Sequence, residues 1–297
     1  MPRFRKPPSP EKQAKSVAKS LQLSGQIPSV RTLANYEERI TQIAKNMTVF
    51  GLPGEVRDLT LQSAIHYLEA RSEEIGQKTL DMERQAIQAM MHQMGTLPGQ
   101  QTLPVIKSEH PQILVSRAYT QHQVNLIASS QQTKQSLATQ IAYSAGLRAH
   151  ELLTLRSIDE RTADKRPSLT TKWQGREGQL YTVHGKGGLV REVLIPYHLA
   201  QQLEQTRLPE PQIIIDRRIK HQIHYNLSGG KKWSDSFSKA AKRALGWSEG
   251  AHGVRHSYAQ ERMHELQTQG LARETALETV SQEMGHFRPQ ITETYLR

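Results

Sequence analysis

Apolar side chains recur every three to four positions through the first third of the chain, the spacing of one face of an α-helix. Ser29 or Thr32 could cap a first helix, and Asp58 or Thr60 a second, because these side chains accept hydrogen bonds from free backbone N–H groups. The pattern predicts a small all-α domain over residues 21–98. Its helical segments are residues 29–51, 58–76 and 79–94.

Two glycines and two prolines between residues 95 and 104 interrupt this pattern and predict a linker over residues 99–114. Beyond it, two short apolar runs flank the glycine-rich stretch His184–Gly188, which predicts two strands joined by a tight turn. Residues 115–297 are therefore expected to form a mixed α/β domain. Its other predicted elements are a helix over residues 131–144, an extended piece at 213–215, a helix from Ser234 or Asp235 to Leu245, and helices from Gly253 onward.

The chain carries 39 Lys and Arg against 28 Asp and Glu, a formal net charge of +11. This excess indicates a polyanionic partner, because phosphate contacts release counterions; a basic protein without such a partner is the alternative. Residues 1–20 hold six basic residues and four prolines, which predicts a flexible basic arm. We expect DNA contacts from this arm and from a basic helix with its preceding loop: Arg3, Arg5, Lys6, Lys231, Lys232, Lys239, Lys242 and Arg243.

The sequence contains no cysteine, which excludes disulfides, thiolate catalysis and zinc–cysteine sites. No apolar run approaches the ~18 residues that cross a bilayer. No apolar stretch follows the basic N-terminus, as a secretory signal would require. We therefore expect a soluble, cytoplasmic and nucleoid-associated protein with no membrane partner.

Four places in the second half carry side chains suited to phosphoryl transfer on DNA. This reaction needs a nucleophile, donors for the non-bridging phosphate oxygens and a proton donor for the leaving oxygen. No motif indicates a metal cluster, so we expect no metal and no other cofactor; arginine can bind the phosphate instead. Any one of these places could be accidental, but the full set in this order indicates one site. The candidates are Arg148 with Glu151 one helical turn on, Lys186 at the turn, His252 with Arg255, and His286 nine residues before Tyr295.

In this order the residues resemble the motifs of the tyrosine recombinases, the phage-integrase family that includes Xer, Cre and lambda integrase. The family pattern is Gly-Leu-Arg-x-x-Glu-Leu, a Gly-Lys-Gly hairpin, His-x-x-Arg, Gly-His, and a tyrosine nine residues later. The resemblance covers residues 115–297, and the first half is compatible with the helical, SAM-like core-binding domain of the family. The matching residues are Arg148, Glu151, Lys186, His252, Arg255, Gly285, His286 and Tyr295.

The resemblance implies a mainly α, two-domain, C-shaped clamp on duplex DNA. It implies that Tyr295 attacks the scissile phosphate, giving a 3′-phosphotyrosyl link without ATP or metal. Lys186 would protonate the departing 5′-oxygen and His252 would assist proton transfer at the tyrosine. The donors for the non-bridging oxygens would be Arg148, Arg255 and His286. The implied partners are a specific recombination site and further copies of the chain, a dimer on one site and a tetramer in synapsis, serving integration or excision of a mobile element.

The sequence departs from the family pattern in two places. The interval from His252 to His286 is longer by about two helical turns, which predicts an inserted or extended helix around residues 267–279. The sequence ends at Arg297, whereas family members usually continue into a segment that docks on a neighbouring subunit; either residues are missing here or assembly uses other surfaces. A type IB topoisomerase-like enzyme and a non-catalytic DNA-binding accessory protein of the same fold are the alternative functions.

Overall fold

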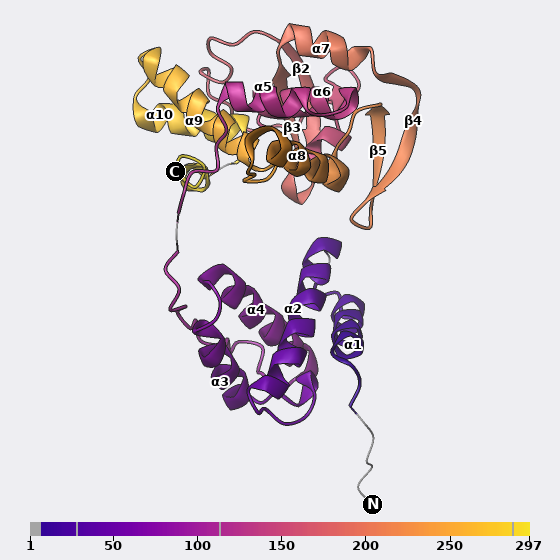
Figure 1. Ribbon diagram of the computed structural model, residues 1–297, viewed down its shortest axis with the longest axis vertical. Helices are drawn as coiled ribbons and strands as arrows, with labels where there is room; N and C mark the ends of the chain where they lie inside the picture. Colours follow the sequence, from indigo (N-terminus) through magenta and orange to yellow (C-terminus); the bar gives the residue numbers. More distant parts are fainter. Residues whose placement is uncertain (1–6, 28, 113, 287) are drawn as a thin grey trace, which may run out of the picture. The chain divides into compact units, whose positions relative to one another are not determined.

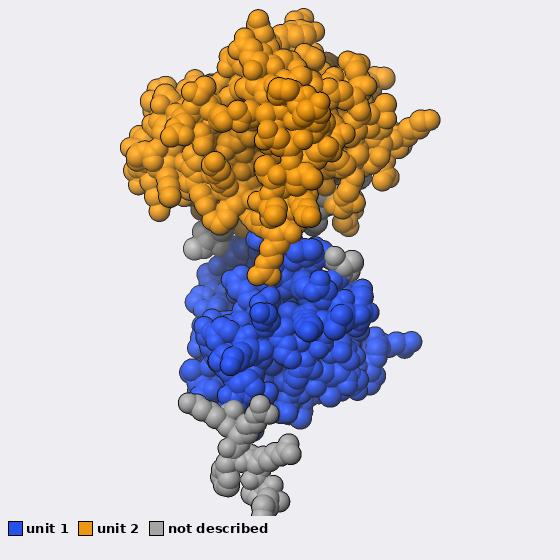
Figure 2. Space-filling view, turned by 90° about the vertical axis from the view of Figure 1, so that its right-hand side faces the viewer, with its two compact units in different colours: residues 1–113 blue, residues 114–297 orange. Residues whose placement is uncertain are grey.

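The computed structural model describes residues 7–27, 29–112, 114–286 and 288–297. The chain forms two compact units, Met1–Ile113 and Leu114–Arg297 (Figure 1, Figure 2). Three of the residues expected to contact DNA, Arg3, Arg5 and Lys6, lie outside the described residues. Among the described helices, none combines the length and the apolar character that a membrane crossing requires.

The first unit packs four helices around one apolar core. Ser29 Oγ accepts a hydrogen bond from the Thr32 N–H at 3.3 Å, and Thr60 Oγ1 accepts one from the Ser63 N–H at 3.2 Å. The expected serine and threonine caps are therefore present, and α2, α3 and α4 confirm the three predicted helical segments. The elements of this unit are α1 (Pro10–Leu23), α2 (Val30–Val49), the 3₁₀ turn η1 (Val56–Asp58), α3 (Leu61–Ser72) and α4 (Gln77–Met94).

The prediction of a flexible arm over residues 1–20 is wrong for its second half, because α1 begins at Pro10. Proline is compatible with the first turn of a helix, where its missing N–H has no partner to lose. Ala14, Val17 and Leu21 follow helical spacing and are fully buried in the core of the first unit. Composition suggested a tail, whereas the positions of these few apolar residues make a helix with one buried face.

Part of the predicted linker over residues 99–114 packs against the first unit instead of connecting the two units freely. Leu103 is buried in the core of the first unit, and its N–H donates to Gln88 Oε1 at 3.0 Å. Further along, the Ser108 N–H donates to Gln77 Oε1 at 2.8 Å and its hydroxyl donates to the Ile75 carbonyl at 2.6 Å. Side chains of α4 thus satisfy the backbone of this irregular segment, which makes it part of the first unit.

The second unit combines helices with two small antiparallel sheets. One sheet has the strand order β1-β2-β3 and the other pairs β4 with β5. Buried side chains of β2 and β3 share one core with those of α5, α6, α7 and α8. The elements are α5 (Gln121–Ser129), α6 (Thr133–Ser144), η2 (Glu151–Leu153), β1 (Arg156–Ser157), β2 (Gln179–His184), η3 (Lys186–Gly188), β3 (Val190–Ile195), α7 (Tyr197–Glu204), β4 (Arg207–Asp216), β5 (Ile219–Tyr225), α8 (Gly230–Leu245), α9 (Gly253–Thr268), α10 (Arg273–Glu283) and α11 (Pro289–Glu293).

Strands β2 and β3 confirm the predicted pair, and β4 contains the extended piece expected at residues 213–215. The turn between β2 and β3 uses positive φ angles at Gly187 (76°) and Gly188 (84°), which glycine adopts without steric cost. Strand β5 was not predicted. Its sequence, Ile219-Lys-His-Gln-Ile-His-Tyr225, is mostly polar because much of the strand is exposed.

The start predicted for α8 is wrong: the helix begins at Gly230, four residues before Ser234. Asp235 does not cap it but forms an ion pair with Lys231 inside the first turns. The carboxylate of Asp216, at the end of β4, accepts the Lys231 N–H at 2.8 Å and so satisfies the helix start from another element. Gly246, with φ of 81°, ends the helix as expected.

The helix expected around residues 267–279 is not one continuous helix: two helices, separated by a turn, span most of the interval between His252 and His286. Helix α9 ends at Thr268, α10 begins at Arg273, and a turn containing Gly270 joins them. Both helices bury apolar side chains in one cluster that also contains Tyr295. These two helices thus pack against the C-terminal segment.

Candidate active site

Arg148 follows the tight turn after α6. Gly146 in this turn has φ of 59°, and a Cβ there would lie 2.7 Å from the Tyr258 ring, so the close approach requires glycine. The Arg148 backbone N–H donates to Glu151 Oε2 at 2.8 Å, and its Nη1 donates to Oε1 at 2.7 Å. The pairing anticipated from the spacing of Arg148 and Glu151 is therefore present, with Glu151 fully buried.

Glu151 binds a second arginine, Arg191 of β3, which the sequence analysis did not single out. Arg191 Nη2 donates to Glu151 Oε2 at 2.7 Å, and its Nη1 donates to the Glu283 carbonyl at 2.7 Å. Burial alone would raise the pKa of Glu151, but the charges of Arg191, Arg255 and Arg148 together hold this pKa below its ordinary value. Glu151 is thus an ionised carboxylate among three guanidinium groups.

A signal for Arg191 was present in the sequence of β3. Alternate strand residues share a face, and Arg191 takes an inward position together with the buried Val193 and Ile195. A charged residue at an inward position of an apolar strand requires a buried partner. What the sequence did not reveal is that this partner is Glu151, 40 residues away.

Arg255 lies in the first turn of α9 and is fully buried. Its guanidinium donates to the carbonyls of Gly146 and, at 3.2 Å, Met284. Within the described part of the chain, its Nε has no hydrogen-bond partner. Burial and the neighbouring charge of Arg148 lower the pKa of Arg255 to about 10, which leaves the group protonated at neutral pH.

His286 follows Gly285 and joins the two arginines. Its Nε2 lies 2.9 Å from Arg148 Nη2 and 3.2 Å from Arg255 Nη2, and its Nδ1 lies 3.0 Å from Thr292 Oγ1. Since guanidinium groups only donate, Nε2 is the acceptor and the proton sits on Nδ1. Burial, with the charges of Arg255 and Arg148, lowers the pKa of His286 to about 3, consistent with a neutral ring.

Tyr295 lies in the turn after α11 and is buried, with 8% of its surface exposed. Its ring centroid lies 5.5 Å from that of His252, 4.8 Å from that of His256 and 5.4 Å from that of His286. The Arg255 guanidinium carbon lies 5.5 Å from the same centroid. Residues from α9 and from the turn before α11 thus surround the aromatic ring.

His252, which precedes α9, and His256 in its first turn differ in their exposure. His252 is exposed, whereas His256 is buried and its Nδ1 has no hydrogen-bond partner in the described part of the chain. Partial desolvation by the surrounding residues, with the charge of Arg255, lowers the pKa of His252. Burial and the charge of Arg117 lower the pKa of His256 to about 4. Both rings are neutral at physiological pH and can accept a proton.

The remaining predicted residues lie apart from this cluster or are only partly described. Lys186 occupies the turn η3 between β2 and β3, and its side chain lies outside what the structure describes. Lys231 and Arg243 are exposed but engaged, Lys231 with Asp235 and Arg243 with the Ser130 carbonyl at 2.6 Å. The predicted basic residues of α8 are all exposed: Lys231, Lys232, Lys239, Lys242 and Arg243.

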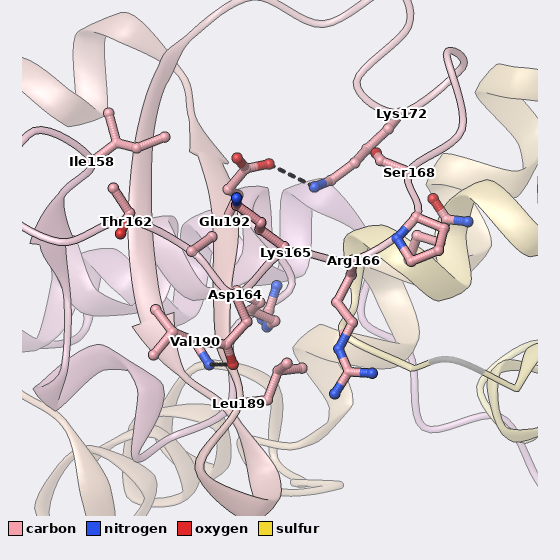
Figure 3. A pocket seen from close by; sticks show the side chains of 15 residues that line it. Ile158, Thr162, Asp164, Lys165, Arg166, Ser168, Lys172, Leu189, Val190 and Glu192 are labelled. Atoms are coloured by element: carbon pink, nitrogen blue, oxygen red, sulfur yellow. Dashed lines mark hydrogen bonds and ion pairs between the residues drawn. The ribbon is translucent and has the colours of Figure 1, made fainter.

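A pocket of about 330 Å³, lined in part by Arg191, lies between β3 and the loop over residues 158–172 (Figure 3). An ion pair between Lys172 and Glu192, at 2.7 Å, lies on its wall. Of the residues that match the family motifs, Gly285 lines this pocket, and the side chains proposed for catalysis do not. In the described ranges, no group of three or more His, Asp or Glu side chains is arranged to hold a metal ion.

No family model matches the chain, and no curated protein matches it in sequence. Solved structures do match in fold. A lambda integrase dimer bound to a COC′ core site is 17% identical with a TM-score of 0.59, over 96% of this chain and 76% of that one. The Tn1549 transposon integrase with transposon right end DNA is 15% identical with a TM-score of 0.57, over 96% and 94% of the two chains.

A third match is XerH site-specific recombinase bound to difH substrate, 13% identical with a TM-score of 0.53. It covers 100% of this chain and 95% of that chain. Since identities of 13–17% establish architecture and leave chemistry open, the matches confirm the fold implied by the sequence motifs. The chain has the fold of the tyrosine recombinases.

Proposed function

We propose that this protein is a site-specific DNA recombinase that cleaves and rejoins duplex DNA through Tyr295, in the integration or excision of a mobile element. The observation that carries the proposal is that Arg255 and His286 lie against the ring of Tyr295 while Arg148 is joined to them through His286. A buried guanidinium beside the tyrosine ring, joined through His286 to the partly buried Arg148, suits a reaction in which negative charge develops on a phosphate.

In the proposed reaction the Tyr295 hydroxyl oxygen attacks the scissile phosphorus and the bond from phosphorus to the 5′-oxygen breaks. The product is a 3′-phosphotyrosyl ester and a free 5′-hydroxyl. One phosphodiester bond replaces another, so the reverse attack by a 5′-hydroxyl reseals a strand without ATP. The tyrosine proton passes to a base, and Lys186 at the hairpin turn supplies a proton to the leaving oxygen.

Arg148 and Arg255 are suited to bind the two non-bridging oxygens. Both are held before any substrate arrives, Arg148 by Glu151 and Arg255 by backbone carbonyls, so little reorganisation accompanies the reaction. The Arg255 Nε is a buried donor without a partner in the described part of the chain, and a phosphate oxygen would satisfy it.

His252 and His286 take different parts in this proposal. His252, neutral and 5.5 Å from the Tyr295 ring centroid, is the candidate base for the tyrosine proton. His286 accepts from both arginines; to donate to a phosphate oxygen it must carry the proton on Nε2, with the guanidinium groups turned to the phosphate. A proton moving to Nε2 leaves Nδ1 as an acceptor for the Thr292 hydroxyl.

Duplex DNA with a specific recombination site is the proposed partner, and further copies of the chain complete the assembly. The proteins with the same fold include a lambda integrase dimer on a core site and a lambda integrase tetramer on a Holliday junction. The exposed basic residues of α8 are the proposed backbone contacts in the second unit. The helical first unit is the proposed core-binding domain.

A covalent trapping experiment tests the proposal without knowledge of the site. Duplexes with one nick and randomised arms are incubated with the protein, because loss of the short cleaved strand traps the adduct. Adducts that resist SDS are recovered and their DNA is sequenced. We expect wild type to enrich one sequence, and Tyr295→Phe to give no adduct while it keeps the packing of the ring.

Variants of the phosphate-binding groups give the second measurement. On the enriched duplex, Arg148→Ala and Arg255→Ala should each form the adduct about 10²–10³-fold more slowly. Strand exchange between two such duplexes supports a recombinase, whereas relaxation of supercoiled plasmid without exchange supports the topoisomerase alternative. If no member of the library forms an adduct, the catalytic proposal is wrong and the accessory-protein alternative takes its place.

A further inference from the structure

One face of α9 runs along Tyr295. His252, at the N-cap of the helix, is followed at intervals of four residues by His256 and Gln260, and this spacing places their side chains in a row. The two imidazoles lie against the aromatic ring, whereas Gln260 reaches the main chain. Its Nε2 lies 3.0 Å from the carbonyl oxygen of Tyr295 and 2.8 Å from that of Arg297. The row therefore contacts both the ring and the backbone of the proposed nucleophile.

The segment that carries Tyr295 has few local restraints of its own. Helix α11, Pro289–Glu293, is only five residues long, and so short a helix is not stable by itself. The backbone of the turn adds one bond at the nucleophile, from the Tyr295 N–H to the Thr292 carbonyl at 2.9 Å. Contacts from other elements must therefore set where this turn lies, and Gln260 supplies a direct one to the residue itself.

We propose that Gln260 is a positioning residue: by donating to the Tyr295 carbonyl it holds the nucleophile in line with Arg148 and Arg255. This inference rests on the proposed function of Tyr295. A displacement of about 1 Å in a reacting group can cost ~10²-fold in rate, so a bond to the main chain of the nucleophile has a large effect on cleavage. DNA affinity depends on other surfaces and is expected to stay the same.

Gln260 also has a third acceptor, which supplies a matched control. Its Nε2 lies 3.1 Å from Ser116 Oγ, in the segment that enters the second unit. A glutamine amide has two N–H groups, so it serves at most two of the three acceptors at one time. Ser116→Ala removes the competing acceptor and leaves both N–H groups to the C-terminal turn. This variant should cleave at least as fast as wild type.

The test compares Gln260→Glu, Gln260→Met and Ser116→Ala with wild type in the full chain. Glutamate keeps the shape of glutamine but, when ionised, offers only acceptors to the two carbonyl oxygens; methionine removes all polar contact. Three quantities are measured: the single-turnover rate of adduct formation on the enriched nicked duplex, the Kd for the same DNA, and amide hydrogen exchange over residues 289–297. Hydrogen exchange needs no catalysis and therefore tests the restraint even if the proposed function fails.

We expect both Gln260 variants to form the adduct about 10–100-fold more slowly, with Kd within about twofold of wild type and faster exchange over residues 289–297. The rate of Gln260→Glu relative to wild type should rise as the pH falls from 8 to 5, because a protonated carboxyl regains one donor. Wild-type rates and exchange in both Gln260 variants overturn the inference. So does an equal loss of DNA binding and cleavage, or exchange that rises equally in Ser116→Ala.

Discussion

Arg191 Nη2 donates a 2.7 Å hydrogen bond to the carboxylate of Glu151. Both residues are buried: 6% of the surface of Arg191 and none of that of Glu151 is exposed. Arg191 comes from β3 and Glu151 from the turn η2. Because both are buried, water cannot replace either as a hydrogen-bond partner. Glu151 in turn binds Arg148, so one buried carboxylate divides its charge between a structural arginine and a proposed catalytic one. The position of Arg148 therefore depends on a residue that touches no substrate in the proposed reaction.

Replacing Arg191 should destabilise the second unit strongly. In Arg191→Met the buried carboxylate loses one of its cations, and loss of one partner from a buried pair costs about 3–5 kcal/mol of unfolding free energy. All three tryptophans, Trp173, Trp233 and Trp247, lie in the second unit, so their fluorescence in urea follows this unit alone. We expect the transition midpoint to fall accordingly.

Arg273→Met is the control for Arg191→Met. Arg273 pairs with Glu293 at 2.8 Å, but half of its side chain is exposed, and such pairs contribute about 0–1 kcal/mol. The two variants remove the same group in different environments. Equal losses of stability would contradict the buried network as the source of the effect.

Gly285→Ala should cost more than a change of backbone conformation alone. Gly285 has φ of 72°, and a Cβ there would lie 2.4 Å from Arg191 Cδ. Arg191 cannot move aside, because Glu151 and the Glu283 carbonyl hold its guanidinium. Gly246→Ala is the matched control, with φ of 81° and nothing within 4 Å of the added carbon. We expect Gly285→Ala to lose about 1–3 kcal/mol more than the control in the same urea measurement.

Acid should destabilise the second unit before its carboxylates titrate. The pKa of His286 is about 3 in the folded chain, against about 6.5 when unfolded, so the unfolded state binds more protons between these values. The stability that neutral His286 provides is complete above pH 6.5 and is lost as the pH falls toward 3. Glu151, whose pKa is lowered, loses its contribution only below about pH 4.5, so the histidines dominate between pH 7.5 and 5. Burial raises the pKa of Glu261, whose protonation opposes this loss at the acid end of the window.

His286→Gln tests this dependence, because glutamine can accept from the arginines but does not titrate. The slope of unfolding free energy against pH should decrease by up to about 1.4 kcal/mol per pH unit. His252 and His256 also have lowered pKa values and will keep part of the slope. An unchanged slope in His286→Gln would show that folding does not lower the pKa of His286.

The basic face of α8 should appear in the salt dependence of DNA binding. Lys239 and Lys242 are exposed one turn apart on α8. If both contact phosphates, Lys239→Gln/Lys242→Gln should reduce the slope of log K against log salt by about 1.8, since each contact contributes about 0.9. Lys134→Gln, on α6 and bonded to Asn226 at 2.6 Å, is the control. Equal slopes for wild type and the double variant would remove α8 from the proposed interface.

Much of the molecule follows from local sequence. The helical segments with their Ser29 and Thr60 caps, the β2–β3 pair, and the glycine that ends α8 were all predicted correctly. Periodicity, capping and turn chemistry depend on residues within a few positions of one another. The order of the motifs likewise identified six candidate residues, and the structure brings Arg148, His252, Arg255, His286 and Tyr295 into one cluster.

Tertiary structure alone decided the rest, because the contacts join residues far apart in the chain. Part of the predicted basic arm forms α1 because its apolar side chains pack in the core of the first unit. Side chains of α4 hydrogen-bond the backbone of the predicted linker. Asp216 accepts the Lys231 N–H in the first turn of α8, which begins earlier than predicted. Glu151 is the buried partner of the inward-facing Arg191. The amide of Gln260 meets the Tyr295 carbonyl 35 residues later. No local pattern records such pairings, since burial creates the demand for a partner and only the fold determines which residue supplies it.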